Sequence, residues 1–203
     1  MKNKKLSFFS DSEDCEKCPE IILSRSQVVH GYGDTHARLM FVVMAPGRNG
    51  ADITGVPFTK DPSGVLFQEC LIRAGFSHET NPRYEHPRLN DVYVTNLVKC
   101  NPKDVTGNNR TPSLEEIKNC STHFEKEIND INPELVVLFG KVVTEHIIQK
   151  KISKFSDYHN KPVNIHNRIF LPFIHPSYVI RGAYNRQKYI EELAGLKTLL
   201  NKR

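Results

Sequence analysis

Long hydrophobic runs are missing from this sequence, which has no stretch of about 18 apolar residues of the kind a membrane-spanning helix needs. The first residues, Met1-Lys-Asn-Lys-Lys, lack the apolar core of a secretory signal. Cysteine is scarce, and its five copies are an odd number that does not suit a disulfide framework. No internal repeat or low-complexity tract is visible. We therefore expect a soluble, cytoplasmic protein with no membrane partner, in which cysteines serve as ligands.

The composition is that of one globular unit. Of 203 residues, 38% are hydrophobic and 25% charged, which suffices for a single α/β core, so we expect one domain over residues 1–203 and a monomer. The net charge is +5, and residues 141–203 hold 12 Lys or Arg against 4 Asp or Glu. This excess is compatible both with phosphate contacts and with an ordinary lysine-rich surface.

Short apolar runs alternate with amphipathic segments. The runs predict buried strands at 38–44, 91–98, 134–139 and 168–173, and the segments predict helices at 64–74, 113–129, 141–149 and 186–200. Ser113 and Glu116 form a capping box that opens the second helix. The alternation predicts an α/β fold with three layers, α/β/α, around a central, mostly parallel four-stranded sheet. Ligands bind beyond the carboxyl ends of such strands, which is where four loops should meet.

Four cysteines are candidate ligands of a metal centre. Cys15 and Cys18 form a Cys-x-x-Cys pair, Cys100 closes a predicted strand, and Cys120 lies on the inward face of a predicted helix. Four thiolates can bind zinc or an iron–sulfur cluster. Zinc ribbons usually have two close pairs, so the single pair favours a cluster slightly, and unligated buried thiols are the alternative. Cys70 falls on an apolar helix face and is expected to be a core residue.

Four motifs follow one another along the chain. They are Ala45-Pro-Gly, Gly50-Ala-Asp-Ile-Thr-Gly-Val-Pro-Phe-Thr-x-Asp-x-Ser-Gly64, Thr95-Asn-Leu-Val-Lys-Cys100 and His175-Pro-Ser-x-x-x-Arg181. Together they resemble the uracil-DNA glycosylase superfamily, and more closely its iron–sulfur branches, families four and five. The second motif is most similar to family five, and the last two are more similar to family four. The resemblance implies a structural [4Fe-4S] cluster on the four cysteines, which would staple the domain, with zinc as the less favoured ligand.

The chemistry of base removal assigns roles to two of the motif residues. Cleavage of the glycosidic bond passes through a cation-like sugar and releases an anionic base, so negative charge is needed beside the sugar and donors beside the base. The resemblance implies that Asp52 orients water and offsets the positive charge, whereas His175 donates to uracil O2. Judged without the motifs, Asp52 would be an Asx turn and His175 a core residue.

The base pocket and the DNA contacts are predicted in the same way. The resemblance implies that the extruded base stacks on Phe58, while the amide of Asn96 reads its Watson–Crick edge and the backbone of Ala45 and Gly47 completes the pocket. The segment after His175 resembles one that enters the minor groove, with Ser177, Tyr178 and Arg181 as DNA contacts. Weaker phosphate candidates are Lys99, Lys141 and Arg186.

The sequence thus predicts a monofunctional DNA glycosylase that hydrolyses the bond to uracil, or to other deaminated bases, in DNA. It would initiate base excision repair and associate with the nucleoid through DNA. No motif lysine stands where a Schiff base would form, so strand cleavage is not expected. The alternative is a non-catalytic iron–sulfur or zinc nucleic-acid-binding module of the same fold.

Overall fold

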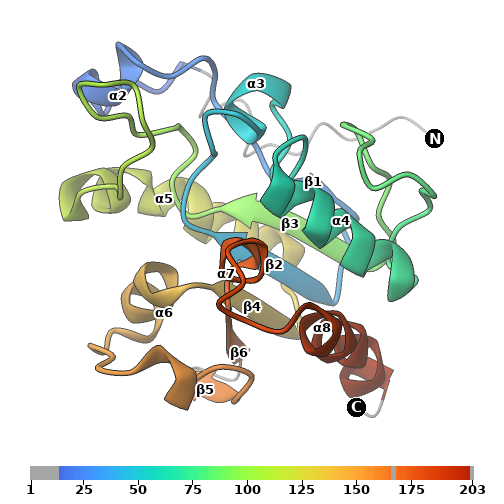
Figure 1. Cartoon of the computed structure of the whole chain (residues 1–203). Helices are drawn as coiled ribbons and strands as arrows, with labels where there is room; N and C mark the ends of the chain where they lie inside the picture. Colours follow the sequence, from blue (N-terminus) through green and yellow to red (C-terminus); the bar gives the residue numbers. More distant parts are fainter. Residues whose placement is uncertain (1–13, 166–167, 202–203) are drawn as a thin grey trace.

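A computed structural model describes residues 14–165 and 168–201 and contains one sheet, in the order β1-β3-β2-β4-β6-β5 (Figure 1). The central strands β3, β2, β4 and β6 pair in parallel, and β1 and β5 are antiparallel edge strands. The bounds are β1 (Tyr32–Gly33), β2 (Leu39–Val43), β3 (Val92–Asn96), β4 (Leu135–Phe139), β5 (Val163–Ile165) and β6 (Arg168–Phe173).

The predicted strand number is therefore corrected from four to six within the described residues. The four predicted segments coincide with the central strands. The two edge strands are only two and three residues long and are not fully buried, so they leave no apolar run in the sequence.

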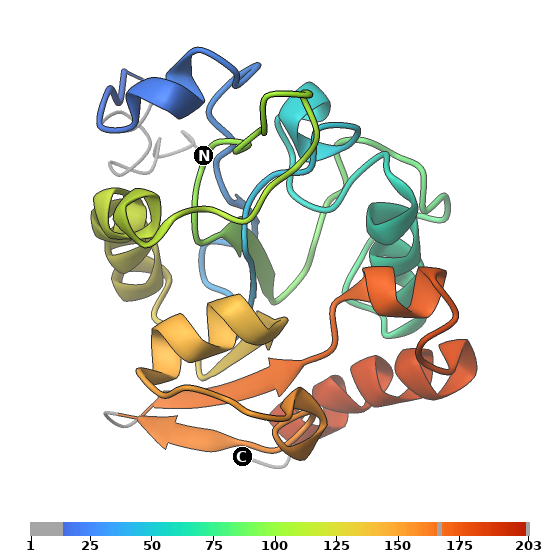
Figure 2. The ribbon, with the colours of Figure 1, turned by 60° about the vertical axis from the view of Figure 1, so that its left-hand side comes forward.

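Helices cover both faces of the sheet, as Figure 2 shows. On β2, Leu39, Phe41 and Val43 belong to the core cluster beneath α4 (Pro62–Arg73) and α8 (Arg186–Asn201). Met40 and Val42 belong to the cluster beneath α5 (Leu114–Ile131) and α6 (Lys141–Ile148). This alternation is the two-residue period of a strand buried on both sides. The helices are α2 (Pro19–Ile22), α3 (Ala51–Thr54), α4 (Pro62–Arg73), α5 (Leu114–Ile131), α6 (Lys141–Ile148), α7 (Pro176–Ile180) and α8 (Arg186–Asn201), with a short 3₁₀ turn, η1 (Phe155–Asp157).

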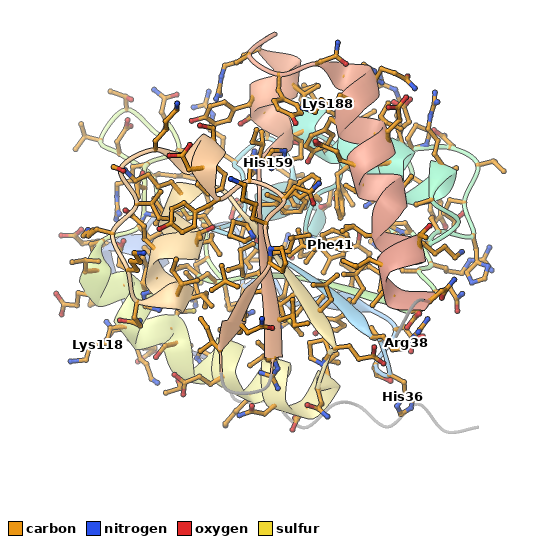
Figure 3. The ribbon with its side chains drawn as sticks, turned by 90° about the horizontal axis from the view of Figure 1, so that it is seen from below. His36, Arg38, Phe41, Lys118, His159 and Lys188 are labelled. Carbon is orange, nitrogen blue, oxygen red and sulfur yellow. The ribbon has the colours of Figure 1, made fainter. Side chains whose placement is uncertain are left out.

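The side chains follow the same division between inside and outside. In Figure 3, Phe41 lies between the sheet and the helices, whereas His36, Lys118 and Lys188 lie at the periphery. Phe41 stacks on Phe139 with ring centroids 5.6 Å apart, which joins neighbouring strands β2 and β4. No described helix is both long and apolar enough to cross a membrane.

Local sequence signals explain where the main helices begin and end. The Ser113 hydroxyl accepts from the Glu116 amide at 3.1 Å and the Glu116 carboxylate accepts from the Ser113 amide at 2.7 Å, so the predicted capping box is present. Asp61 caps α4 through a single bond from the Gly64 amide, ahead of Pro62 in the first turn. Helix α5 ends where Asn132 adopts a left-handed conformation.

Candidate functional site

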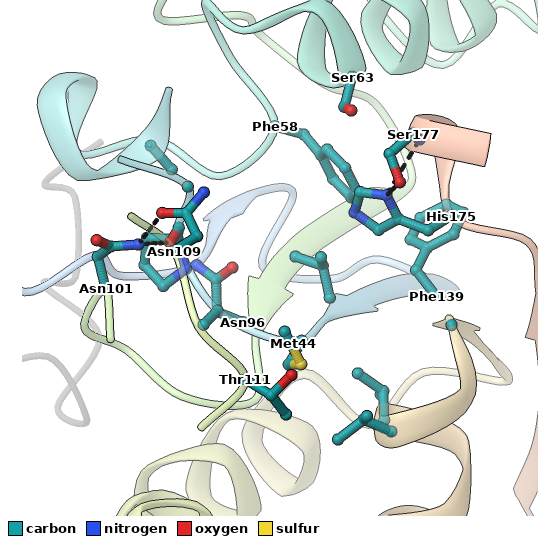
Figure 4. Close-up of a pocket in the computed structure, with 18 of the residues that line it drawn as sticks. Met44, Phe58, Ser63, Asn96, Asn101, Asn109, Thr111, Phe139, His175 and Ser177 are labelled. Atoms are coloured by element: carbon teal, nitrogen blue, oxygen red, sulfur yellow. Dashed lines mark hydrogen bonds between the residues drawn. The ribbon is translucent and has the colours of Figure 1, made fainter. Parts of the chain in front are cut away.

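A pocket of about 610 Å³ opens at the carboxyl ends of the central strands, where the loop rule places a ligand (Figure 4). Its wall combines segments that follow β2, β3, β4 and β6, so residues distant in the sequence meet there. The sequence-predicted residues that line it are Ala45, Gly47, Phe58, Asn96, His175, Ser177, Tyr178 and Arg181. Asp52 is not among the lining residues.

The side chain of Asn96 is the most unusual polar group of the pocket. Asn96 ends β3 and is 1% exposed, yet neither its Oδ1 nor its Nδ2 has a hydrogen-bond partner within the described residues. An unsatisfied buried polar group costs about 1–3 kcal/mol, so such groups are rare in native proteins. A ligand that presents an acceptor beside a donor would satisfy both atoms at once.

The ring of His175 is held in one tautomer at the start of α7. Its Nδ1 accepts from the backbone amide of Ser177 at 3.1 Å and lies 3.0 Å from the Ser177 hydroxyl. Because Nδ1 accepts, the proton of the neutral imidazole is on Nε2. Burial, assisted by the positive charge of Arg181, lowers the pKa of His175 to about 4. At neutral pH the ring is therefore an uncharged hydrogen-bond donor.

Phe58 forms an aromatic wall beside this imidazole. Its ring centroid lies 5.4 Å from that of His175 and 5.2 Å from that of Phe139, a lining residue that the sequence analysis missed (Figure 4). The backbone of Phe58 has a φ of 52°, which is uncommon for a bulky residue. Gly64 allows this conformation to pack closely, since a Cβ there would stand 2.7 Å from the Phe58 carbonyl carbon.

Asp52 is placed differently from the prediction. It is 1% exposed, its carboxylate accepts from the amide and hydroxyl of Ser26 at 3.1 and 2.8 Å, and it pairs with Lys103 at 2.9 Å. The geometry gives it the role of anchoring neighbouring segments, rather than a place beside a ligand. Its neighbour Ala51 lines the pocket instead. Successive helical residues point about 100° apart, and the sequence could not show which of the two faces inward.

Asp61 is the carboxylate that does line the pocket. Its Oδ1 accepts from the Gly64 amide at 2.7 Å, and burial raises its pKa. Gly47 and Gly50 lie against the other oxygen, because a Cβ added to either would come within 3.1 Å of Oδ2. The signal for Asp61 was its place ahead of Pro62 in the second motif, but that position also describes a simple helix cap.

Two asparagines close the opposite side of the pocket and were also missed. Asn101 donates from Nδ2 to Asn109 Oδ1 at 2.8 Å, and Asn109 Oδ1 accepts as well from the Arg48 amide at 3.0 Å (Figure 4). These bonds hold the loop after β3 against the loop after β2. The sequence signal at these positions is a long loop rich in Asn, Pro and Gly over residues 101–112, which is typical of a functional or mobile loop but does not identify these side chains.

The residues predicted to contact DNA divide into rim and interior. Tyr178 is 50% exposed on α7, with the Arg181 guanidinium 5.0 Å from its ring centroid, so both lie at the pocket rim. Lys141 also lines the pocket and is exposed. Lys99, in contrast, is 3% exposed and paired with Glu127, which excludes the predicted surface contact. Arg186 is paired with Glu69.

The four candidate ligand cysteines, Cys15, Cys18, Cys100 and Cys120, line a second cavity of about 20 Å³. Nitrogen donors approach their sulfurs: Arg25 Nη1 lies 3.3 Å from Cys100 Sγ, and the Lys99 amide lies 3.2 Å from Cys120 Sγ. Burial raises the pKa of Cys120 to about 11. Across the described part of the chain, no set of three or more His, Cys, Asp or Glu side chains has the geometry of a metal-ion site.

Lys99 connects the two cavities. Its backbone amide donates to Cys120 Sγ, while its ammonium donates to the Asn96 carbonyl at 2.7 Å and to the Thr95 hydroxyl at 2.6 Å. Glu127 neutralises this buried charge. Lys99 thus fixes the backbone of Asn96, whose side-chain amide is unsatisfied, and it also contacts the cysteine site.

Comparisons with known proteins identify related sequences over most of the chain. A model of the uracil DNA glycosylase superfamily matches residues 30–194. A Type-4 uracil-DNA glycosylase of Thermotoga maritima is 31% identical over 191 residues, which are 93% of this chain and 90% of that protein. A Type-4 enzyme of Pyrobaculum aerophilum is 28% identical, with 90% of this chain and 87% of that protein covered. A Type-5 uracil-DNA glycosylase of the same organism is 27% identical, with 75% and 80% covered.

Proposed function

The chain belongs to the uracil-DNA glycosylase superfamily, and from this membership we propose that it hydrolyses the N-glycosidic bond of uracil in DNA and so initiates base excision repair. The unsatisfied amide of Asn96 in the pocket is the observation that carries this proposal. Residues 1–203 would form one glycosylase domain, and no strand cleavage is expected.

The amide of Asn96 matches the imide edge of uracil. Its Nδ2 would donate to O4 and its Oδ1 would accept from N3–H, which satisfies both buried atoms. Cytosine exchanges the donor and the acceptor on this edge, so uracil would be selected by an amide that keeps Nδ2 towards O4 and Oδ1 towards N3. Because the target base must leave the duplex, it would stack against Phe58, whose ring already lies close to Phe139 and His175.

His175 would stabilise the departing base. When the bond to the sugar breaks, negative charge develops on the uracil ring, and Nε2–H of the neutral imidazole can donate to O2 without transferring its proton. The Ser177 amide fixes the tautomer, so Ser177 would act through the histidine rather than through DNA. Tyr178 and Arg181 at the rim would contact the nucleic acid beside the extruded nucleotide.

We assign the negative charge beside the sugar to Asp61 rather than to Asp52, because Asp61 lines the pocket and Asp52 is bound to Ser26 and Lys103. Asp61→Asn should slow base release by about two orders of magnitude or more in single-turnover assays, while DNA affinity is retained. Asp52→Asn should mainly lower thermal stability. The opposite pattern would return the catalytic role to Asp52.

The four cysteines would hold a [4Fe-4S] cluster. Four thiolates suit a zinc ion or an iron–sulfur cluster, and the single Cys-x-x-Cys pair together with the resemblance to the iron–sulfur branches of the family favours the cluster. Lys17 and Arg25 also line the cavity and would offset the negative charge of the thiolates. The cluster would supply a structural cross-link. Iron analysis and a visible absorption band near roughly 400 nm test this assignment.

Abasic-site formation tests the catalytic proposal. The purified protein is incubated with oligonucleotides that carry uracil, hypoxanthine, xanthine, cytosine or thymine, and alkali-labile sites are counted. We expect abasic sites at uracil and none at cytosine or thymine. Asn96→Asp should reduce the preference for uracil over cytosine, because a carboxylate cannot donate to O4. DNA binding without any abasic site would instead indicate a non-catalytic module.

A further inference from the structure

His123 is a buried histidine that the proposed reaction does not use. It lies on α5, is 7% exposed, and both Nδ1 and Nε2 lack a hydrogen-bond partner among residues 14–165 and 168–201. A neutral imidazole always carries one N–H, and leaving it unbonded inside a protein is costly. The same side chain lines the small cavity of the four cysteines. A group bound in that cavity would therefore face an unused donor.

The surroundings of His123 favour sulfur as the acceptor. One face of α5 presents Asn119, Cys120 and His123 to the cavity. His123 follows Asn119 by four positions and Cys120 by three, which places the three side chains on the same side of the helix. Asn119 Nδ2 lies 3.8 Å from Cys18 Sγ. The charged residues of the lining are cations, which can donate but not accept. The remaining lining is largely apolar, so the sulfurs are the main acceptors within the cavity.

Three of the four cysteine sulfurs already have an N–H donor among the described residues, and Cys15 is the exception. Cys18, Cys100 and Cys120 each have an N–H donor directed at Sγ, from Asn119, Arg25 and Lys99 respectively. Within the part of the chain that the structure describes, the Cys15 sulfur has no such donor, although the cavity that Cys15 lines also contains His123.

We propose that His123 donates a hydrogen bond to a sulfur of the bound cluster and raises its reduction potential, an inference that rests on the proposed cofactor. Reduction adds negative charge to the cluster, and an N–H directed at a sulfur stabilises that charge. His123 would be a positioning and tuning residue, and it is not a ligand.

Redox titration of the intact, cluster-loaded protein tests the inference. His123→Leu removes the donor, and His123→Gln keeps an N–H on a side chain of similar reach. His146→Leu is the matched control, because His146 is a partly buried helical histidine outside the cavity. At a fixed solution potential, we expect His123→Leu to raise the ratio of oxidised to reduced cluster about tenfold. This change corresponds to a reduction potential lowered by about 59 mV for a one-electron couple. His123→Gln and the control should remain near the unmodified protein.

Pulsed electron paramagnetic resonance of the reduced cluster gives an independent readout. With ¹⁵N-labelled histidine, a weak nitrogen coupling is expected in the unmodified protein and should vanish in His123→Leu. Unchanged potentials together with no histidine coupling, in a protein that contains iron, would overturn the role of His123 alone. A protein that binds no iron would overturn the cofactor assignment and this inference, while uracil excision in the same sample would leave the catalytic proposal standing.

Discussion

The two cavities of this molecule differ in size and in the groups that line them. The pocket of about 610 Å³ contains the amide of Asn96 without partners. In the cavity of about 20 Å³, nitrogen donors point at Cys100 and Cys120, and the imidazole of His123 is the group without a partner. A wide pocket suits a ligand that enters and leaves in each turnover, whereas a small cavity lined by four thiols suits a group that stays bound. This contrast supports the proposed division between a catalytic pocket and a structural site.

Removal of a cysteine ligand should produce the largest effect and would separate the two sites most sharply. Cys100→Ser should abolish the visible absorption band and lower the melting temperature by about 10 °C, because cluster binding adds directly to folding stability. The control is Cys70→Ala, since Cys70 lies on the buried face of α4, in the core and not in the cysteine cavity. That variant should lose some stability and keep the band. A band retained by Cys100→Ser would remove Cys100 from the ligand set.

Changes at His175 test the open pocket. His175→Phe preserves a ring but removes the Nε2 donor, so the single-turnover rate of uracil release should fall by about 10²- to 10³-fold, the range for a lost oxyanion donor. Ser177→Ala should have a smaller effect, because the Ser177 backbone amide still bonds to Nδ1. If the two variants were equally slow, the hydroxyl rather than the imidazole would be the important group.

The pH dependence of stability gives a third test of the pocket. The unfolded chain protonates a histidine near pH 6.5, but the pKa of folded His175 is about 4, so the unfolded state binds more protons between these values. Stability should therefore fall as the pH falls, and His175 should account for about 2 kcal/mol between pH 7.5 and 5.0. Urea unfolding of the unmodified protein and of His175→Phe measures this share. Identical pH slopes would contradict it.

The smallest effect is expected from a single methyl group behind Phe58. Gly64→Ala places a Cβ 2.7 Å from the Phe58 carbonyl carbon, so the ring should shift and uracil release should slow by about tenfold, or about 1.4 kcal/mol. Gly195→Ala is the matched control, because nothing lies within 4 Å of a Cβ on that α8 glycine. It should raise stability slightly and leave the rate unchanged. Equal rates for both variants would show that Phe58 tolerates displacement.

The sequence determined more of the fold than of the site. Fully buried central strands produce continuous apolar runs, and the carboxyl-end rule then brings Asn96 and His175 to one pocket. The edge strands escaped notice because strands of two or three residues with exposed positions carry no such run. The sequence also could not predict the direction of each side chain within a motif. Ala51 lines the pocket, whereas its neighbour Asp52 points away from it and pairs with Lys103.

The sequence also did not predict which charged side chains are buried or paired. Lys99 stands between Val98 and Cys100 at the end of a strand, and a lysine is ordinarily expected at the surface. Its placement in the interior depends on Glu127, which comes from a helix 28 positions away in the sequence. A pairing of this kind requires tertiary structure, because no local pattern identifies the partner. The positive excess of residues 141–203 likewise did not reveal that Arg186 pairs with Glu69.

The double attachment of Lys99 has an evolutionary consequence. Because Lys99 contacts Cys120 through its backbone and Asn96 through its ammonium, a substitution of Lys99 would disturb the cysteine site and the pocket at the same time. Changes at Lys99 and Glu127 should show strong epistasis, and natural variants should acquire or lose this pair together. Drift towards a new base preference would thus have to proceed through other positions around the pocket.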